Sequence, residues 1–259
     1  MVKLDVTITT EMLILLFSLI FLAGFIDSIA GGGGLITLPA YLAVGLPAHL
    51  AMGTSKFSSL FGTGMASYRF ISNGHVHWRS AMAAFIGALV GAWTGSQIVL
   101  MLDERTVRFI VLVLVPMVLV FMLLRKDFGI NPNPVPANRV LPYSVLIGLV
   151  IGGYDGFFGP GSGTFLIIAF TAVMGLDIIT ACGNAKIVNF ASNIASVAAF
   201  VLNDSVMFSI AVPAAMFGMA GNYIGSGFAM SKGVKIVRPM MLVVITMLLA
   251  RILWDLLST

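Results

Sequence analysis

The sequence DSIAGGGGLITLP, residues 27–39, places a carboxylate, four consecutive glycines and a proline inside an otherwise apolar part of the chain. It follows the end of an apolar stretch over 12–30 and overlaps a second one over 35–50. Glycine lets the backbone turn sharply, and proline interrupts the hydrogen bonding of a helix interior. The stretch therefore predicts an apolar helix that stops, turns and restarts.

The composition predicts a membrane protein. Of the 259 residues, 59% are hydrophobic and 9% are charged, and the mean hydropathy is +1.06. Charged residues make up about a quarter of an ordinary soluble domain. The first apolar stretch lacks the small-residue cleavage pattern of a signal peptide and is expected to be a transmembrane helix. The single Cys182 excludes an intramolecular disulfide and a cysteine metal cluster, and no cofactor or metal is predicted.

The second half of the chain repeats the first. GFIDSIAGGGG at 24–34 recurs as GGYDGFFGPGSG at 152–163, an offset of 128 positions. GTSK at 53–56 recurs as GNAK at 183–186, and this offset of 130 holds to the end of the chain. One half is therefore a copy of the other, and corresponding residues are expected to occupy corresponding places in the fold.

The join between the copies is RKDFGINPNPVPANR, residues 125–139, whose prolines and charges do not suit hydrocarbon. The chain thus divides into a first transmembrane repeat (1–124), a cytoplasmic linker (125–139) and a second transmembrane repeat (140–259). Each repeat contains five apolar segments. They cover 12–30, 35–50, 57–71, 81–102 and 107–124 in the first repeat, and 141–158, 164–179, 187–202, 206–230 and 237–257 in the second.

The second segment of each repeat is too short or too broken for a straight span, which needs about 20 residues. Pro39 and Pro47 interrupt 35–50, and Gly175 interrupts 164–179. Irregular backbone at membrane depth is tolerated only where protein surrounds it or where it lines a wet cavity. The expected fold is an all-α polytopic membrane protein with two homologous halves, each containing one broken or re-entrant helix.

Counting Lys and Arg favours inverted repeats, because cytoplasmic loops carry an excess of both. If each half crosses the bilayer an odd number of times, the linker is cytoplasmic and both termini are external, and this scheme requires the broken segments to cross. One side then collects Arg69, Arg79, Arg125, Lys126, Arg139, Lys232, Lys235 and Arg238, and the other keeps chiefly Lys3, Arg105 and Arg108. An even number of crossings gives parallel repeats and splits these charges evenly. Purely re-entrant short segments would leave eight helices and parallel copies.

Interrupted segments at corresponding places in two halves indicate a transporter's substrate site. A glycine turn before a helix leaves backbone N–H groups unpaired, and the helix dipole attracts an anion there. The predicted binding glycines and their neighbour are Gly31, Gly32, Gly33, Gly34, Gly159, Gly161, Ser162 and Gly163. The alternative is that these glycines only allow close helix packing, as expected for Gly87, Gly91 and Gly95 at their four-residue spacing.

Four ionisable residues recur in register inside apolar surroundings: Asp27, Lys56, Asp155 and Lys186. Each costs at least about 2.5 kcal/mol in mid-membrane, so each should be paired or functional. Two Asp/Lys pairs could simply hold the broken segments in place. Alternatively the lysines attract an anion, while an aspartate takes up a proton or pairs with a lysine when the site is empty. The two interpretations are compatible.

Polar residues near the lysines extend the predicted lining. Ser59 and Thr63, and likewise Asn189 and Asn193, are four residues apart and share a helix face. Such groups could donate hydrogen bonds to sulfonyl-like oxygens, or they could serve only as hydrogen bonds between helices. The binding residues predicted from this group are Thr54, Ser55, Asn184 and Asn189.

The motifs DSIAGGGG and YDGFFGP, with TSK and NAK downstream, closely resemble the TauE/SafE family of membrane permeases, specifically a subgroup of bacterial inner-membrane proteins. The resemblance covers nearly the whole chain. It implies a multi-pass transporter of the plasma (inner) membrane. Characterised relatives are linked to sulfite, sulfoacetate and other sulfur-containing organic anions.

The resulting hypothesis is a secondary transporter of a small anion of the oxidised-sulfur class, bound at the midplane between the repeats. A passive anion channel with the same lining is the first alternative, since its flux would not concentrate substrate. A membrane-embedded enzyme or assembly factor is the second, although no Ser/His/Asp set supports it. The expected partners are a small anion and the bilayer, with room for a homo-oligomer and no nucleic acid.

Overall fold

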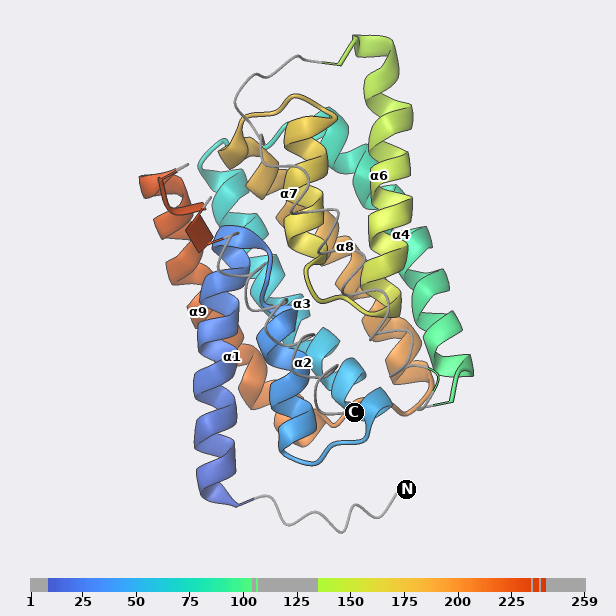
Figure 1. Ribbon diagram of the computed structural model, residues 1–259, viewed down its shortest axis with the longest axis vertical. Coiled ribbons are helices and arrows are strands. Elements are labelled where there is room, and N and C mark those ends of the chain that lie inside the picture. Colours follow the sequence, from blue (N-terminus) through green and yellow to red (C-terminus); the bar gives the residue numbers. More distant parts are fainter. Residues whose placement is uncertain (1–8, 104–105, 107–134, 234, 238, 241–259) are drawn as a thin grey trace, which may run out of the picture.

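The computed structural model describes residues 9–103, 106, 135–233, 235–237 and 239–240, which form α-helices joined by short turns and contain no strand (Figure 1). The all-α prediction is confirmed for this part of the chain. The helices are α1 (Thr10–Ala30), α2 (Gly34–Ala43), α3 (Ala48–Ser72), α4 (Trp78–Met101), α6 (Ala137–Phe157), α7 (Ser162–Ala172), α8 (Ile178–Leu202) and α9 (Phe208–Lys232).

Several predictions fall on residues outside the described part. These are the segment 107–124, all of 237–257 except residues 237, 239 and 240, linker positions 125–134, and the charged residues Lys3, Arg105, Arg108, Arg125, Lys126 and Arg238. At the end of the predicted linker, α6 already begins at Ala137, directly after Pro136. Proline suits this position because it lacks the N–H that a helix start leaves unpaired.

Four helices, α1, α4, α6 and α8, are long and apolar enough to cross a membrane. The helices α3 and α9 are each 25 residues long, as α8 is, but they are less apolar. The helices α2 and α7, of 10 and 11 residues, are the short members expected in each half.

One boundary differs from the sequence prediction. The hydropathy pattern placed an interruption between 50 and 57, but α3 runs unbroken from Ala48 to Ser72 through the sequence GTSK. The same holds for GNAK inside α8. Hydropathy falls at these tetrapeptides because they contain polar residues. In the structure these polar side chains are buried inside the molecule, and the helix continues through them. Lys56 and Lys186 therefore project from the middle of long helices.

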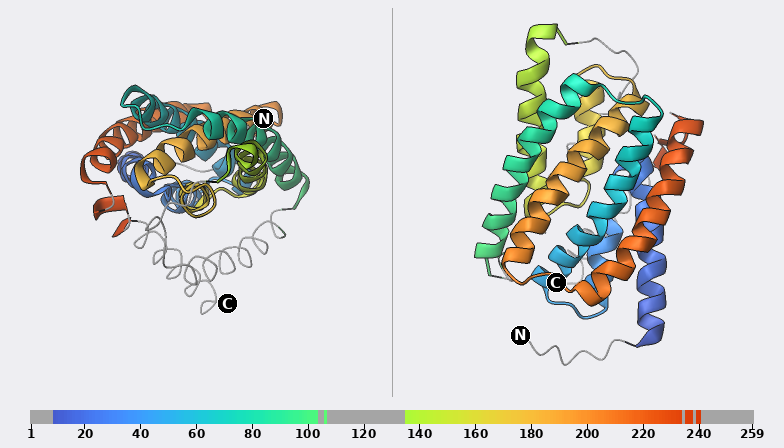
Figure 2. Two further views of the ribbon diagram at one scale, coloured as in Figure 1. Left: turned by 90° about the horizontal axis from the view of Figure 1, so that it is seen from above. Right: turned by 180° about the vertical axis from the view of Figure 1, so that it is seen from behind.

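The two halves are packed into one another. The helix α4 packs along α6, and α9 packs along α1, so that the fourth helix of each half contacts the first helix of the other. A row of α4, α8, α3 and α9 forms the back of the molecule, in which α8 and α3 are neighbours at the centre (Figure 2). Each of the four long apolar helices, α1, α4, α6 and α8, thus contacts at least one helix of the other half.

Glycines allow these helices to approach closely. A β-carbon at Gly91 would lie 2.2 Å from the carbonyl oxygen of Leu149 in α6, and one at Gly221 would lie 2.1 Å from the carbonyl oxygen of Phe21 in α1. Gly87 and Gly95 contact α6 in the same way. The predicted close packing by small residues is confirmed for α4, and a matching contact joins α9 to α1.

The short helices start side by side at the centre of the molecule and run apart. In Figure 1, α2 descends from the end of α1, whereas α7 ascends from the end of α6. Each first helix and its short partner thus form a hairpin, and the two hairpins open toward opposite ends. The turns of both hairpins meet in the middle, and they position the site described below.

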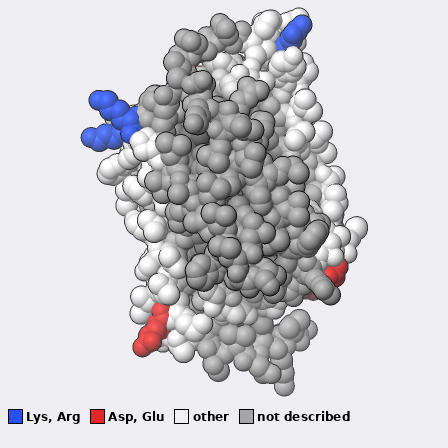
Figure 3. All heavy atoms as spheres, in the orientation of Figure 1, with Lys and Arg blue, Asp and Glu red and all other residues white. Residues whose placement is uncertain are grey.

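The two ends of the molecule differ in charge. The surface view shows Lys and Arg toward the upper end and Asp and Glu toward the lower end (Figure 3). At the upper end the described helices and the segments next to their ends carry the basic residues Arg69, Arg79, Arg139, Lys232 and Lys235, together with Asp177. At the lower end they carry the acidic residues Glu11, Asp103 and Asp204.

Candidate functional site

The glycine turns of the two halves contact each other directly. Gly31 ends α1 with a φ of 78°, and Gly161 precedes α7 with a φ of 83°, both in the left-handed region that favours glycine. A β-carbon at Gly31 would lie 2.2 Å from the carbonyl carbon of Gly163. The Thr164 hydroxyl donates to the Ala30 carbonyl oxygen over 2.6 Å and joins the turns. The repeated glycines therefore bring the starts of α2 and α7 together.

Two ion pairs cross between the halves at these turns. Lys186 Nζ of α8 lies 2.7 Å from Asp27 Oδ2 of α1, and Lys56 Nζ of α3 lies 2.9 Å from Asp155 Oδ1 of α6. The sequence predicted two Asp/Lys pairs without deciding which residues pair. Each carboxylate pairs with the lysine of the opposite half, so the four charges link the two repeats and their formal charges sum to zero.

The two pairs have different surroundings. Asp155 also accepts a hydrogen bond from the Ser162 hydroxyl over 2.7 Å and one from the Ser192 hydroxyl. Asp27 instead accepts from the Gly33 backbone N–H over 3.2 Å. Glycines, Gly34 and Gly62, occupy the first-half positions in register with the two serines. The two halves therefore differ in the residues around their carboxylates, and Asp155 accepts hydrogen bonds from more side chains than Asp27 does.

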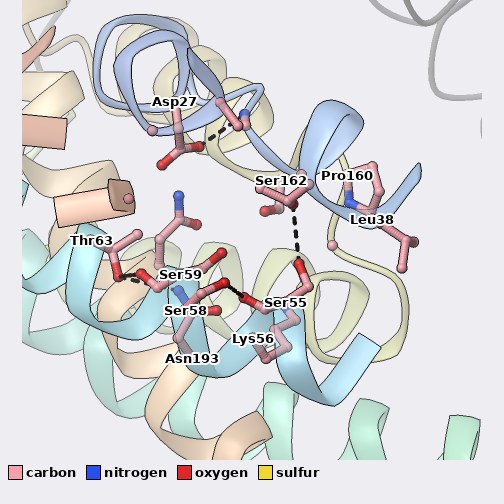
Figure 4. A pocket seen from close by; sticks show the side chains of 18 of the residues that line it. Asp27, Leu38, Ser55, Lys56, Ser58, Ser59, Thr63, Pro160, Ser162 and Asn193 are labelled. Atoms are coloured by element: carbon pink, nitrogen blue, oxygen red, sulfur yellow. Dashed lines mark hydrogen bonds between the residues drawn. The ribbon is translucent and has the colours of Figure 1, made fainter. Parts of the chain in front are cut away.

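A cavity of about 70 Å³ with both polar and apolar residues in its lining lies beside the turns (Figure 4). At about 10–15 Å³ for each water, this volume accommodates about five waters or one small ion. Serines and threonines of α3 supply one wall, and the turns and asparagines of α8 and α9 supply the others. The polar lining residues are Asp27, Thr37, Ser55, Lys56, Ser58, Ser59, Thr63, Asp155, Ser162, Asn189, Asn193 and Asn222.

Most of the residues predicted from the sequence lie at this cavity. The predicted residues in its lining are Asp27, Gly31, Gly33, Gly34, Ser55, Lys56, Asp155, Gly159, Ser162 and Asn189. The predicted residues outside its lining are Gly32, Thr54, Gly161, Gly163, Asn184 and Lys186. Lys186 is nevertheless connected to the cavity through its partner Asp27.

Thr54 and Asn184 have a different position from the one expected. They correspond at the offset of 130, and both are fully buried away from the cavity. The Thr54 hydroxyl accepts a hydrogen bond from the backbone N–H of Met207, and the Asn184 side-chain oxygen accepts one from the backbone N–H of His77. Each residue thus holds the turn that precedes α9 or α4 in the opposite half.

Backbone N–H groups at the turns are less available than the glycine run suggested. Gly33 N–H donates to Asp27, and Leu35 N–H and Ile36 N–H donate to the carbonyl oxygens of Gly32 and Gly33. The start of α2 therefore offers the positive end of the helix dipole but few free donors. The ammonium group of Lys56 is the positive side chain in the cavity lining among the described residues.

Sequence reasoning missed Asn222 of α9. Its side chain is 4% exposed and lines the cavity, but Ala92 occupies the corresponding position of the first half, so the repeat did not mark it. The available signal was a single asparagine inside an apolar segment, where a polar residue tends to face protein rather than lipid. Thr37 and Ser58 were missed for the same reason.

The model of the family described as "Sulfite exporter TauE/SafE" matches residues 16–252. The chain belongs to the TauE/SafE family. It is 34% identical over 250 residues to "Probable membrane transporter protein ORF9" of Sinorhizobium sp, with 95% of this chain and 94% of that protein covered. It is also 34% identical over 242 residues to "Probable membrane transporter protein YfcA" of Escherichia coli strain K12, with 93% and 89% covered. No solved structure matches the chain.

A relative from Haemophilus influenzae, also named "Probable membrane transporter protein", is 31% identical over 245 residues, with 95% of this chain and 96% of that protein covered. These relatives match nearly end to end, so this TauE/SafE protein shares their whole length and not an isolated module. Together with the long apolar helices, they identify a multi-pass membrane transporter, not an enzyme.

Proposed function

We propose that this TauE/SafE protein is a secondary transporter that binds a small anion of the oxidised-sulfur class, such as sulfite or an organosulfonate, in the cavity between its halves. The observation that carries the proposal is the position of Lys56. Its side chain is 9% exposed and lines the cavity, and its ammonium would lie 3.2 Å from a β-carbon at Gly159, beside the turn into α7. A fixed cation beside a helix start attracts small anions.

When no substrate is bound, the ion pair with Asp155 supplies the counterion of Lys56. An oxyanion that approaches Lys56 competes with the Asp155 carboxylate for the ammonium hydrogens. Ser162 and Ser192 donate to Asp155 and stabilise its negative charge when the lysine turns toward substrate. Binding therefore exchanges one anionic partner of Lys56 for another, so that the ammonium group keeps a counterion while Asp155 keeps its two serine donors.

The inverted repeat is part of the same proposal. The hairpins α1–α2 and α6–α7 open toward opposite ends, as expected for halves inserted in opposite directions (Figure 1). The basic end of the molecule is assigned to the cytoplasm, because Lys and Arg are enriched on that side of membrane proteins. Each hairpin is assigned as a re-entrant pair in which the first helix and the short helix both enter and leave on one side, so that the pair adds no net crossing and the repeats stay inverted. The turns meet near the midplane, and rocking of one half against the other would open the site to alternate sides.

Uptake into proteoliposomes tests the proposal. With sulfite as the probe, the wild-type protein is expected to accumulate the anion above its external concentration when an ion gradient is imposed. Equilibration without accumulation under every imposed gradient would identify a passive channel instead. The substitution Lys56→Met should reduce uptake about tenfold or more, since removing one partner of a buried charge pair is severe.

The matched control is Lys232→Met, which removes an exposed lysine at the end of α9 by the same substitution. Its uptake should equal that of the wild type. The thermal unfolding midpoint of each variant separates a damaged fold from a damaged site. Undiminished sulfite uptake by folded Lys56→Met protein would defeat the assignment of the site.

A further inference from the structure

We infer that the cavity selects an oxyanion that carries its own hydrogen-bond donor, an O–H or N–H group, and that Asn189 and Asn222 read this donor. The inference rests on the proposed function and narrows its substrate class. It begins with the uneven exposure of the ion pairs. Asp27 is 17% exposed while its partner Lys186 is 0% exposed, so that pair presents its carboxylate.

The other pair presents both of its partners, and Lys56 is the cation. Lys56 is 9% exposed and its partner Asp155 is 6% exposed. Asp27 lies against the first glycine turn, where a β-carbon at Gly33 would be 2.5 Å from its own, and Lys56 lies against the second turn at Gly159. Figure 4 shows Asp27 and Lys56 on opposite sides of the cavity. The lining thus has a carboxylate alone on one side, and on the other an ammonium group beside its paired carboxylate.

Most hydroxyl groups in the lining have already used their donors. The Ser55 hydroxyl donates to Thr37 Oγ1, that of Ser58 to the Ser55 carbonyl oxygen, and that of Thr63 to the Ser59 carbonyl oxygen. The Ser162 hydroxyl donates to Asp155. Each of these oxygens keeps a lone pair, so toward a ligand these hydroxyls act as acceptors.

Two further acceptors are buried without a partner among the described residues. The side-chain oxygens of Asn189 and Asn222 have no hydrogen bond, and each residue is 4% exposed in the cavity lining. The amide of Asn222 is oriented by its Nδ2, which donates to the Gly218 carbonyl oxygen over 3.0 Å. Buried polar atoms are nearly always hydrogen-bonded, so these oxygens call for a donor from water or from a ligand.

The room for Asn222 is made by glycines. A β-carbon at Gly24 would lie 2.8 Å from Asn222 Nδ2, and one at Gly62 would lie 2.5 Å from it. Gly24 is one helical turn before Asp27, which places the asparagine on the same side of the cavity as the exposed carboxylate. Asp27 and Asn222 therefore place acceptors on the side of the cavity opposite the ammonium group of Lys56, and Asn189 adds a further acceptor to the lining.

A ligand that suits both sides has anionic oxygens for Lys56 and at least one O–H or N–H group for the acceptors. A monoprotonated oxyanion and a hydroxyl- or amino-substituted small sulfonate both meet this requirement. A fully ionised oxyanion leaves the asparagine oxygens unpaired and brings additional negative charge toward Asp27, whereas an alkyl sulfonate leaves these oxygens unpaired. The four charged groups of the site, Asp27, Lys56, Asp155 and Lys186, already balance one another, which disfavours a dianion.

Two nearly isosteric sulfonates test the inference at a single pH. Hydroxymethanesulfonate and ethanesulfonate are both monoanions and differ by an O–H in place of a methyl group. Calorimetric titration of the purified protein should give about tenfold tighter binding of hydroxymethanesulfonate, because a satisfied buried acceptor is worth about that factor. The affinities of aminomethanesulfonate and of hydrogensulfite, each compared with that of ethanesulfonate, show whether an N–H or an acidic O–H group strengthens binding as much as the hydroxyl group does.

Substitutions locate the groups that read the donor. In Asn222→Leu and Asn189→Leu the preference for hydroxymethanesulfonate should fall toward unity, while Asn73→Leu, at an exposed position after α3, should keep it. Equal binding of the two sulfonates by the wild type overturns the inference and leaves the proposed function standing. A preference that survives in both cavity variants overturns the assignment to the asparagines. Failure of every sulfonate and of hydrogensulfite to bind overturns the proposed function, and this inference with it.

Discussion

Lys186 and Asp27, 159 positions apart in the sequence, form an ion pair in which the two partners have very different access to the cavity. The Lys186 side chain is 0% exposed and the Asp27 side chain is 17% exposed. In its counterpart both partners, Lys56 and Asp155, line the cavity. The duplicated charges thus join the halves in equivalent ways, but one pair reaches the cavity through its carboxylate alone and the other through both of its charges.

The unequal burial predicts unequal effects of removing either partner. Asp27→Asn leaves the ammonium group of Lys186 without its counterion in a fully buried place, whereas Lys186→Met leaves a carboxylate that cavity water can reach. Asp27→Asn should therefore lower the free energy of unfolding by about 3–5 kcal/mol, and Lys186→Met by less. Equilibrium unfolding of the purified protein in micelles measures both.

The double variant Asp27→Asn/Lys186→Met removes both charges and should recover most of that loss, since an uncharged pair carries no desolvation penalty. If the effects of the two single substitutions instead add up in the double variant, the two side chains do not interact as described.

The contact between the glycine turns predicts a strong effect of one methyl group. Gly31→Ala places a β-carbon 2.2 Å from the Gly163 carbonyl carbon, at a residue with a φ of 78°. Gly74→Ala is the matched control, because Gly74 has a φ of 75° and no atom within 4 Å of an added β-carbon. The control should cost about 1–2 kcal/mol from the left-handed backbone alone.

Gly31→Ala should cost clearly more than Gly74→Ala in the same unfolding measurement, and it should also weaken anion binding, because the turns must separate to admit the methyl group. Equal losses of stability in the two variants, with binding intact, would show that the turns are not held against each other.

The proposed orientation predicts which end of the molecule faces the cytoplasm. Cys182 is the sole cysteine and is buried, so Cys182→Ser gives a background for labelling of introduced cysteines. A membrane-impermeant maleimide should label Glu11→Cys in right-side-out vesicles, and Arg139→Cys only in inside-out vesicles. The opposite labelling pattern would show that the protein has the reverse orientation. Labelling of both positions from the same side would show that the two ends of the molecule do not lie on opposite sides of the membrane.

Much of this architecture could be predicted from the sequence, because the two halves of the chain repeat the same pattern of segments and motifs. Apolar segments with a common spacing and the repeated glycine runs defined membrane helices, the short helices α2 and α7, and the turns that precede them. The four in-register charges pointed to two ion pairs. Segment boundaries were less accurate, because hydropathy cannot distinguish a polar tetrapeptide that ends a helix from one that is buried within it, as GTSK is in α3.

The pairing across the halves could not be predicted, because a repeat shows which positions are equivalent but not which half supplies the partner. Three-dimensional packing decides this: α8 brings Lys186 to α1, and α3 brings Lys56 to α6. Departures from the repeat were also hidden. Asn222 corresponds to Ala92, and Ser192 to Gly62, so a search for repeated residues passes over both.

The placement of Thr54 and Asn184 predicts that stability and binding can be separated. Each side chain accepts a hydrogen bond from the backbone N–H of a turn in the opposite half, at Met207 or His77. Thr54→Val and Asn184→Leu leave that N–H without its acceptor and should lower the free energy of unfolding by about 1–3 kcal/mol. Because both residues lie outside the cavity lining, the Kd for sulfite or a bound sulfonate should remain that of the wild type.

Asn193→Leu is the comparison within the cavity, where the Asn193 side chain donates to Thr63 over 3.2 Å. It should change the Kd, since it replaces a polar group of the lining with an apolar one. If Thr54→Val or Asn184→Leu weakens anion binding as strongly as Asn193→Leu, while unfolding is unaffected, then these residues contact the substrate and the boundary drawn around the cavity is wrong. Thermal unfolding and calorimetric titration of the same protein samples distinguish the two outcomes.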